Sequence, residues 1–538
     1  SFSPPSSRFA HGGLSAGEAA SATPSRPRLS SRPAGARLTR QSCPLPSSYS
    51  QPAPTAQQQR HRATPPPFPP APSGALGMSA AAAPPDWRFF QVFGEEQPEG
   101  TGVEDIQEAD LLSALDFDET GDYLATGDRG GRAVVFERAA VDKANEVSPD
   151  VRPDHASLRA RNDAQYCFLT EFQSHEPEFD YLKSLEIEEK INCIRWCRGS
   201  MGCKMLLSTN DKTIKLWKIY GKRIKILSNM NIEHANGATV SSGNAAQAWG
   251  AGHGLRLPLM TTRERVVTAT PKRTYSNAHA YHINSIALNS DGESFMSCDD
   301  LRLNVWNLNN NSSCFNIVDV KPANMEALSK VITSADFHPT HCHTFLYSSS
   351  RGCVRLGDMR AAALCDTSMK VFEEPEDPAN RSFFSEIISS ISNAKFSRDG
   401  RYIVTRDYLN VRVWDVNMES RPIKTFHMNE HLRPKLCVLY EKDCIFDKFE
   451  ACFNYDGKHV LTGSYQNKFN MLSVDGSAPD LVLEASQTPH RRAPSQMQQY
   501  NSELPRDFSR RILHASFHPH QNLVAIAATS TLYIMNGS

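Results

Sequence analysis

The repeating unit of this chain is clearest in Asn393-Ala394-Lys395-Phe396-Ser397-Arg398-Asp399-Gly400-Arg401-Tyr402-Ile403-Val404-Thr405-Arg406-Asp407-Tyr408-Leu409-Asn410-Val411-Arg412-Val413-Trp414-Asp415. A four-residue seed ends in Phe396, and Asp399-Gly400 supplies the glycine that a tight hairpin turn needs. The apolar run 402–404 is typical of a strand buried on both faces. The alternating run 411–414 is typical of a half-buried strand. The stretch therefore predicts three consecutive strands joined by turns.

The same seed occurs seven times along the chain. The copies are 114–117, 193–196, 285–288, 334–337, 393–396, 450–453 and 514–517. A β unit that cannot bury its own apolar face must stack on copies of itself, and seven copies are enough to close a ring. Four-stranded units of this kind form propeller blades, and the pair Trp414-Asp415 is the signature of the WD-repeat class. We therefore expect an all-β fold, a seven-bladed WD-repeat β-propeller.

The propeller is expected to span residues 87–538 as one domain. The last unit contains only three strands before Ser538, and the apolar run 87–93 is predicted to supply its missing outer strand. Pairing the two ends of the chain in one blade would remove an exposed sheet edge. The segment 78–86 is predicted to be a short flexible lead-in. The weakly apolar insertions at about 138–164 and 228–262 are predicted to be flexible loops.

Residues 1–77 differ in composition from the rest of the chain. They are rich in Pro, Ser, Ala and Arg, and Glu18 is their one acidic residue. Such a segment is predicted to be disordered because it cannot bury enough apolar surface to fold. The chain begins at Ser1, and Met78 is followed by Ser-Ala-Ala-Ala-Ala, so our hypothesis is a translated leader ahead of the authentic start. An organelle transit peptide is the alternative interpretation.

Overall composition excludes several classes of function. The 58 basic and 59 acidic side chains argue against a chain that binds nucleic acid mainly through phosphate contacts. Thirteen cysteines follow no framework spacing, which predicts reduced thiols and a cytoplasmic location, with the nucleus as a second one. No run of about 18 apolar residues occurs, so no membrane span is expected.

Motifs of catalysis and metal binding are not found in the sequence. There is no Gly-x-x-x-x-Gly-Lys-[Ser/Thr] phosphate loop and no Gly-x-Ser-x-Gly elbow. The Gly-rich run 127–131 lies between two expected strands, which favours a turn over a phosphate cradle. The run His341-Cys342-His343 has no second ligand pair at finger-like spacing, which favours a solvated turn over a metal site. We expect no catalytic, metal-binding or cofactor-binding residues and no cofactor.

Several stretches between the blades are more specific than the repeat. They are 172–192, which contains Phe179-Asp180-Tyr181-Leu182-Lys183-Ser184-Leu185-Glu186-Ile187, then 207–218, 372–378 and 380–392, which contains Asn380-Arg381-Ser382-Phe383-Phe384-Ser385-Glu386-Ile387-Ile388. Together they resemble the 55-kDa regulatory B subunits of type 2A protein phosphatase, from about residue 87 to the end of the chain. The Gly-rich insertion 228–262 is similar to the plant form of that family.

The resemblance implies a protein that is not itself an enzyme. Family members bind a helical-repeat scaffold (A) subunit and a catalytic (C) subunit, and they recruit phosphoprotein substrates. In the family, a β-hairpin arm within about 175–192 projects from the second blade onto the scaffold. The predicted scaffold-binding residues are therefore Phe179, Tyr181, Leu182, Leu185 and Ile187. These side chains are more apolar than a solvent loop requires, which indicates either a partner site or a satellite core under the propeller.

The resemblance also implies substrate docking on an acidic top face. The matching positions are Glu108, Arg129, Tyr281, His282, Asp300 and Leu328. Carboxylates on a rigid rim attract basic residues that flank a phosphosite. Arg129 stands where the family often has Lys, and Cys298 replaces a small residue before Asp299-Asp300, which could shift the turn that holds Asp300. Asp300 could instead serve only its own turn, and Glu108 could be a solvated loop residue.

We therefore expect a substrate-targeting subunit of a heterotrimeric serine/threonine phosphatase, with no nucleic-acid or membrane partner. The alternative is a different interaction propeller, either a substrate receptor of a ubiquitin ligase or a chromatin-peptide reader. An enzyme in its own right is a third hypothesis.

Overall fold

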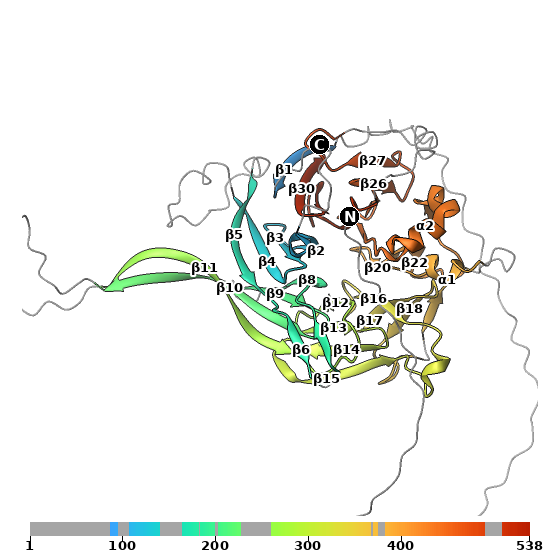
Figure 1. Ribbon diagram of the computed structural model, residues 1–538, viewed down its shortest axis with the longest axis horizontal. Coiled ribbons are helices and arrows are strands. Elements are labelled where there is room, and N and C mark those ends of the chain that lie inside the picture. The colour runs from blue at the N-terminus through green and yellow to red at the C-terminus, as the bar shows by residue number, and fades with distance from the viewer. Residues whose placement is uncertain are drawn as a thin grey trace, which may run out of the picture. The chain divides into compact units, whose positions relative to one another are not determined.

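Seven four-stranded antiparallel sheets form the ring that the repeat predicts (Figure 1). The computed structural model describes residues 87–94, 107–139, 164–181, 183–198, 203–227, 260–366, 369–374, 382–489 and 508–537. All of these belong to the compact unit Leu76–Ser538. The predicted extension 1–77 and lead-in 78–86 lie outside the described residues.

The first three blades run outward from the ring axis in chain order, except for the extra hairpin described below. Blade 1 is β2 (Leu112–Phe117), β3 (Tyr123–Asp128), β4 (Arg132–Ala139) and β5 (Gln165–Gln173). Blade 2 is β8 (Cys193–Cys197), β9 (Lys204–Thr209), β10 (Ile214–Leu227) and β11 (Met260–Tyr275). Blade 3 is β12 (Ser285–Leu288), β13 (Ser294–Cys298), β14 (Arg302–Asn307) and β15 (Asn310–Asp319).

The remaining blades repeat this order. Blade 4 is β16 (Ile332–Phe337), β17 (Thr344–Ser349), β18 (Val354–Asp358) and β19 (Lys370–Phe372). Blade 5 is β20 (Asn393–Phe396), β21 (Tyr402–Arg406), β22 (Asn410–Asp415) and β23 (Lys424–His427). Blade 6 is β24 (Ala451–Phe453), β25 (His459–Gly463), β26 (Lys468–Ser473) and β27 (Leu481–Glu484). All seven predicted seeds lie in or overlap innermost strands, which confirms the sequence period.

Blade 7 closes the ring as predicted. Its strands are β28 (Ile512–Phe517), β29 (Leu523–Ala528), β30 (Thr531–Gly537) and, as the outer strand, β1 (Trp87–Phe93). β1 pairs with β30 from Trp87–Gly537 to Phe93–Leu532. The Trp87 side chain is buried, and its ring lies 6.5 Å from that of Phe517. The pairing therefore combines a hydrogen-bonded ladder with an aromatic anchor.

Apolar clusters between neighbouring blades form the core. In one cluster, Ala125 and Val135 of blade 1 pack with Trp196 and Trp217 of blade 2. At the lower end of the ring, which carries the turns between first and second strands, glycine permits still closer contact. Gly121 has a φ of +75°, and a Cβ there would lie 2.0 Å from the His518 ring of blade 7. Blades 1 and 7 therefore pack so closely at this turn that only glycine can be accommodated.

Some residues at the ends of the predicted insertions belong to strands. Arg138 and Ala139 belong to β4, where they pair with Tyr166 and Gln165 of β5. Residues 260–262 begin β11 and pair with β10. Most of the remaining insertion residues lie outside the described part. No helix among the described residues is long and apolar enough to cross a membrane.

Candidate functional site: the upper rim of the propeller

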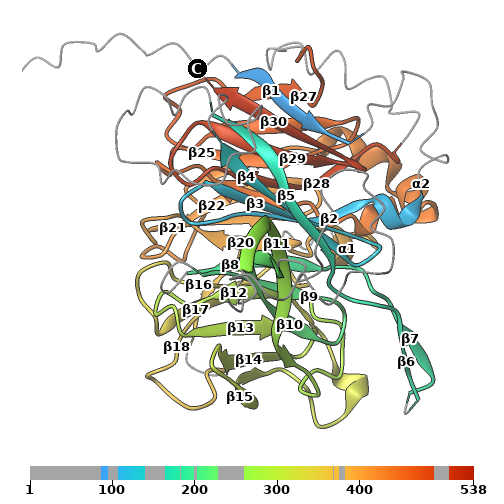
Figure 2. The same ribbon diagram turned by 90° about the vertical axis from the view of Figure 1, so that its left-hand side faces the viewer.

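The six predicted docking residues lie at one end of the ring, which we call the upper rim. It consists of the loops that lead into each blade's first strand and the turns between second and third strands, which share an end because successive strands alternate in direction. Short helical elements also lie there: η2 (Glu108–Asp110), η4 (Met325–Ala327), α1 (Ser385–Ile388), η6 (Glu430–Lys435), α2 (Leu436–Glu441) and η7 (Cys444–Phe446). In Figure 2, α1 and α2 lie on the same side of the ring.

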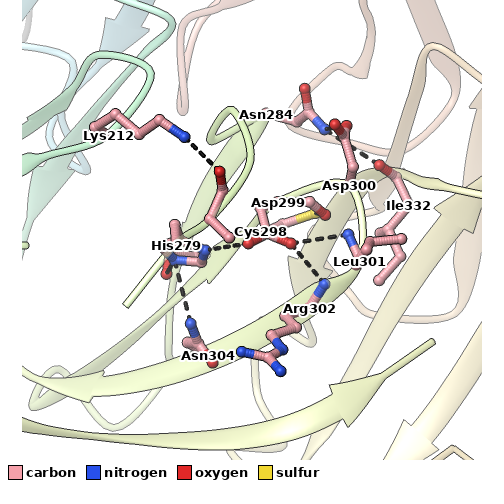
Figure 3. Close-up of polar contacts among 12 residues, drawn as sticks. Lys212, His279, Asn284, Cys298, Asp299, Asp300, Leu301, Arg302, Asn304 and Ile332 are labelled. Carbon is pink, nitrogen blue, oxygen red and sulfur yellow. Dashed lines mark hydrogen bonds and ion pairs between the residues drawn. The ribbon is translucent and has the colours of Figure 1, made fainter. Parts of the chain in front are cut away.

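Asp300 occupies the tip of a turn that its neighbour holds closed. Asp299 Oδ1 accepts hydrogen bonds from the backbone N–H groups of Leu301 (2.8 Å) and Arg302 (2.7 Å), as Figure 3 shows. The Cys298 thiol is buried and lies 3.4 Å from the Asp299 carbonyl oxygen. The turn in blade 2 is closed in the same way, since Asn210 Oδ1 accepts from two backbone N–H groups. Cys298 is therefore accommodated without loss of these turn bonds.

Below this turn lies an Asp-His-Ser network that resembles a hydrolase triad in composition. His279 Nδ1 is 2.9 Å from Asp299 Oδ2, and His279 Nε2 is 2.6 Å from Ser297 Oγ. Ser297 Oγ also accepts a 2.8 Å hydrogen bond from the Trp306 indole. Burial would raise the pKa of Asp299, but bonds from His279 and the Leu301 backbone lower it below its ordinary value. Ser297 and Asp299 are fully buried, so no substrate can reach the hydroxyl and the network fastens blade 3.

The side chain of Asp300 itself is held from a neighbouring loop. Asn284, just before β12, donates from Nδ2 to Asp300 Oδ1 (2.9 Å) and to the carbonyl oxygen of Ile332 in blade 4 (3.2 Å). Lys448, in the loop that leads into blade 6, donates to Asn284 Oδ1 at a distance of 3.4 Å. These contacts connect blades 3, 4 and 6 around one carboxylate.

Three of the predicted docking residues share a cavity of about 540 Å³ at the ring opening. They are Arg129, His282 and Asp300. The His282 side chain is exposed and lies 2.9 Å from the Asp211 carboxylate. Lys190 also lines this cavity, where burial and then the charge of Arg129 lower its pKa. The opening therefore combines acidic and basic groups, unlike the mainly acidic face that the resemblance implies.

The other three docking residues lie outside this cavity. Glu108 is largely exposed in η2 and forms an ion pair with Arg129. Leu328, which follows η4, is half-buried, and so is Tyr281. Among the described residues, Glu108 is thus joined to the cavity through its ion pair with Arg129.

The predicted hairpin arm is present between β5 and β8. β6 (Glu178–Asp180) pairs with β7 (Leu185–Ile187), and Figure 2 shows this hairpin projecting from the ring. Phe179 is 46% exposed, Tyr181 85% and Leu185 59%, whereas Ile187 is half-buried. These exposures contradict the satellite-core interpretation. Leu182 lies outside the described residues.

A second, longer hairpin was missed by the sequence analysis. β10 pairs with β9 only as far as Ile219, and beyond that point it pairs with β11 alone (Figure 1). Its free part carries Lys222, Arg223 and Lys225, all exposed, together with Ile224, whose side chain is 40% exposed. The signal was the continuation of β-forming residues past Trp217, where a blade strand would end.

Exposed aromatic side chains gather on the upper rim between blades 4 and 6. Phe383 is 73% exposed, Tyr440 42% and Phe446 52%, and the ring centres of Phe383 and Tyr440 lie 6.0 Å apart. Phe384 joins the group, 5.2 Å from Phe383. We call Phe383, Phe384, Tyr440 and Phe446 the aromatic cluster. The pair Phe383-Phe384 is evident in the sequence, but its exposure is not, because exposure of an aromatic ring depends on the conformation of the loop that carries it.

Charged side chains of the innermost strands face the ring axis. The third seed position supplies Asp116, Arg195, Asp336 and Lys395, and Arg195 Nη1 is 3.7 Å from Asp116. Burial raises the pKa of both Asp116 and Asp336. The sequence indicates this ring of charges by a charged residue at the third seed position in four of the seven copies.

Comparison with known proteins agrees with this architecture. Residues 269–307 match the family model "WD domain, G-beta repeat". This match covers the Asp299-His279-Ser297 network of blade 3. Within the described residues, no group of three or more His, Cys, Asp or Glu side chains could hold a metal ion.

Curated relatives match most of the chain. A regulatory subunit of serine/threonine-protein phosphatase 2A from Dictyostelium discoideum is 47% identical over 84% of this chain and 98% of its own length. The B beta isoform of the 55 kDa regulatory subunit from Arabidopsis thaliana is 48% identical over 85% and 98%. The regulatory B chain of protein phosphatase PP2A from Schizosaccharomyces pombe is 48% identical over 84% and 97%.

Proposed function

Since this chain belongs to the 55 kDa regulatory B family of serine/threonine-protein phosphatase 2A, we propose that it binds a scaffold and a catalytic subunit and docks phosphoprotein substrates on its upper rim. Membership of this family makes the chain a regulatory subunit. We propose in addition that catalysis resides in the separate catalytic chain. The proteins recruited would carry basic residues beside the phosphosite.

One observation supports the docking proposal above the others. Arg129, His282 and Asp300 come from three different connections, yet they line a single cavity at the ring opening. A rigid β-ring holds such side chains at fixed separations, so binding costs little ordering entropy. Charged groups around an opening also attract a substrate of complementary charge and raise its rate of encounter.

The docking proposal is tested by charge reversal at Asp300 in a reconstituted complex of scaffold, catalytic and regulatory chains. Asp300→Lys is expected to raise the KM for a phosphopeptide with basic flanks about 10-fold or more, since a like charge replaces an attractive one. Hydrolysis of p-nitrophenyl phosphate, which needs no docking, should not change. Equal loss of scaffold binding would show misfolding or a wrong surface.

Scaffold binding is proposed for the projecting hairpins. The β6–β7 hairpin carries the predicted residues Phe179, Tyr181 and Leu185 with large exposed apolar area, which usually marks a partner site. The β10–β11 hairpin offers a basic alternative, through Lys222 and Arg223. Pull-down of the purified scaffold with Tyr181→Ser and, separately, with Lys222→Glu/Arg223→Glu would show which hairpin is required. Retention of full binding by both variants would contradict the proposal.

The alternative function, that of an interaction propeller outside phosphatase complexes, is tested by identifying the proteins that bind the full chain. Affinity purification of the full chain from cells should recover phosphatase scaffold and catalytic chains. Recovery of ubiquitin-ligase components without phosphatase chains would overturn the assignment of partners.

A further inference from the structure

The same kind of hydrogen bond recurs between neighbouring blades at four places on the upper rim. A side chain at the start of a blade's first strand donates to a backbone carbonyl oxygen of the following blade, at 2.6–3.2 Å. The donor–acceptor pairs are Ser113–Ile191, Asn192–Ile283, Asn284–Ile332 and Ser392–Phe449. This bond ties neighbouring blades together, and either serine or asparagine can make it.

Asparagine makes a second bond, to a carboxylate, that serine does not make at this position. The Ser113 and Ser392 hydroxyls each lie near a second oxygen as well, but it is a backbone carbonyl of their own blade, at 3.4 Å and 3.1 Å. A hydroxyl has one proton to donate, whereas a side-chain amide has two. Asn284 uses its second N–H on the Asp300 carboxylate (2.9 Å), and Asn192 uses its own on the Asp211 carboxylate (2.7 Å), as Figure 3 shows for Asn284. The interblade bond therefore explains why a hydroxyl is sufficient at Ser113 and Ser392. It does not explain the second N–H of each asparagine, which donates to a carboxylate.

The orientation of the Asn284 amide is fixed from three directions. Its NH₂ group faces two oxygens, of Asp300 and Ile332, and its carbonyl oxygen faces the Lys448 ammonium. A flipped amide would lose all three contacts. The bond to Asp300 engages Oδ1, and no residue of the described ranges donates to Oδ2. One carboxylate oxygen is thus held while the other is left for a group that enters the cavity.

We infer that Asn284 is a positioning residue for substrate docking: it holds the Asp300 carboxylate so that its second oxygen meets a cationic side chain of the substrate. The inference rests on the proposed function of Asp300. Without the bond, the carboxylate gains rotamer freedom, which a bound substrate must remove again. Hydrogen bonds to charged groups are stronger than those between neutral groups, so the loss should be measurable.

The repeat itself supplies the test variant. Asn284→Ser is expected to keep the interblade bond, as Ser113 and Ser392 do, and it removes the bond to Asp300 together with the contact from Lys448. In the reconstituted complex we expect the KM for a phosphopeptide with basic flanks to rise about 3- to 10-fold with kcat unchanged. Scaffold affinity and thermal unfolding should stay at wild-type values. The control is Ser392→Ala, which removes the interblade bond to the Phe449 carbonyl oxygen and leaves Asp300 held.

A double-mutant cycle separates this inference from the proposed function. If Asn284 acts through Asp300, Asn284→Ser should add nothing to the KM of an Asp300→Asn background. Additive effects in the cycle would overturn the inference, and so would a wild-type KM for Asn284→Ser beside a raised KM for Asp300→Asn. A wild-type KM for Asp300→Asn would instead overturn the proposed role of Asp300. An equal KM rise in Ser392→Ala would show general loosening of the rim and would overturn the specific role of Asn284.

Discussion

At the lower end of the ring, the turns between first and second strands are short and contact the neighbouring blade, whereas the loops that lead into the first strands on the upper rim carry helical elements, exposed aromatic rings and charges that face solvent. His518 illustrates the lower end, since it is buried and touches the glycine turn of the next blade. Phe383 illustrates the upper rim, since it is 73% exposed. The same repeat thus stabilises the ring at one end and leaves side chains available for recognition at the other.

The largest effect is expected where blades interlock at the lower end. Gly121→Ala would place a Cβ 2.0 Å from the His518 ring, so we expect it to lower the free energy of unfolding by about 3–5 kcal/mol. Gly457→Ala is the control, because Gly457 has nearly the same φ (+73°) in the equivalent turn and nothing lies near its Cβ. That variant should cost only about 1–2 kcal/mol of backbone strain. Denaturant unfolding of both variants measures the difference, and equal losses would show that blade contact is irrelevant.

Stability should also respond to acid, through buried His518 at the lower end and buried His175 on the upper rim, where the His175 backbone N–H donates to Gly131 in the β3–β4 turn. Burial, and then Arg138, lowers the pKa of His518 to about 4, and burial, followed by Lys215, lowers that of His175 to about 3. The unfolded chain, with an ordinary pKa of 6.5, therefore binds more protons than the folded one at intermediate pH. Stability should be complete above about pH 6.5 and fall progressively toward about pH 4. Melting temperatures across this range test the expectation, and His518→Gln should flatten the dependence.

A smaller effect is expected in the aromatic cluster. Tyr440→Ser removes an exposed ring, so we expect the free energy of unfolding to change by about 0.5 kcal/mol or less. Binding of one or more partners should weaken by more than this, if the upper rim serves recognition. Denaturant unfolding compared with pull-down of the scaffold, the catalytic chain and phosphopeptides measures both quantities. Marked destabilisation would mean that the cluster belongs to the core.

The smallest effect is expected at the exposed ion pair of Glu108 and Arg129. Glu108→Gln should reduce the free energy of unfolding by less than about 1 kcal/mol, because water and salt screen such pairs. A phosphopeptide KM that changes by more than stability does would support docking at Glu108. An unchanged KM would favour the interpretation of a solvated loop residue.

Much of the ring could be predicted from the sequence because its information is local. Each seed, turn and alternating strand lies within a short stretch, and the closing strand 87–93 was identified by a deficit of one strand in the last unit. The β10–β11 hairpin was not found, because alternation continues unchanged when a strand leaves its blade. Periodicity specifies which face of a strand is apolar, but not what covers it.

The polar contacts of the site were less predictable. Asp300 was placed at a tight turn correctly, but its clamp joins Asn284 with Lys448, which lies 164 positions away in sequence. The Asp299-His279-Ser297 network joins the loop before β12 with β13 and the turn that follows it, and His279 lies 18 and 20 positions from its two partners in the sequence. Contacts that depend on closure of the whole ring cannot be inferred from any single repeat.

The pairing of β1 with β30 has a consequence for synthesis. β1 leaves the ribosome before every blade, and its partner leaves after all of them. Throughout translation the apolar strand Trp87–Phe93 has no sheet to join, and the growing arc exposes an open edge that can pair with other chains. The nascent protein should therefore depend on chaperones until its final strand appears, and premature termination would release a chain that cannot close.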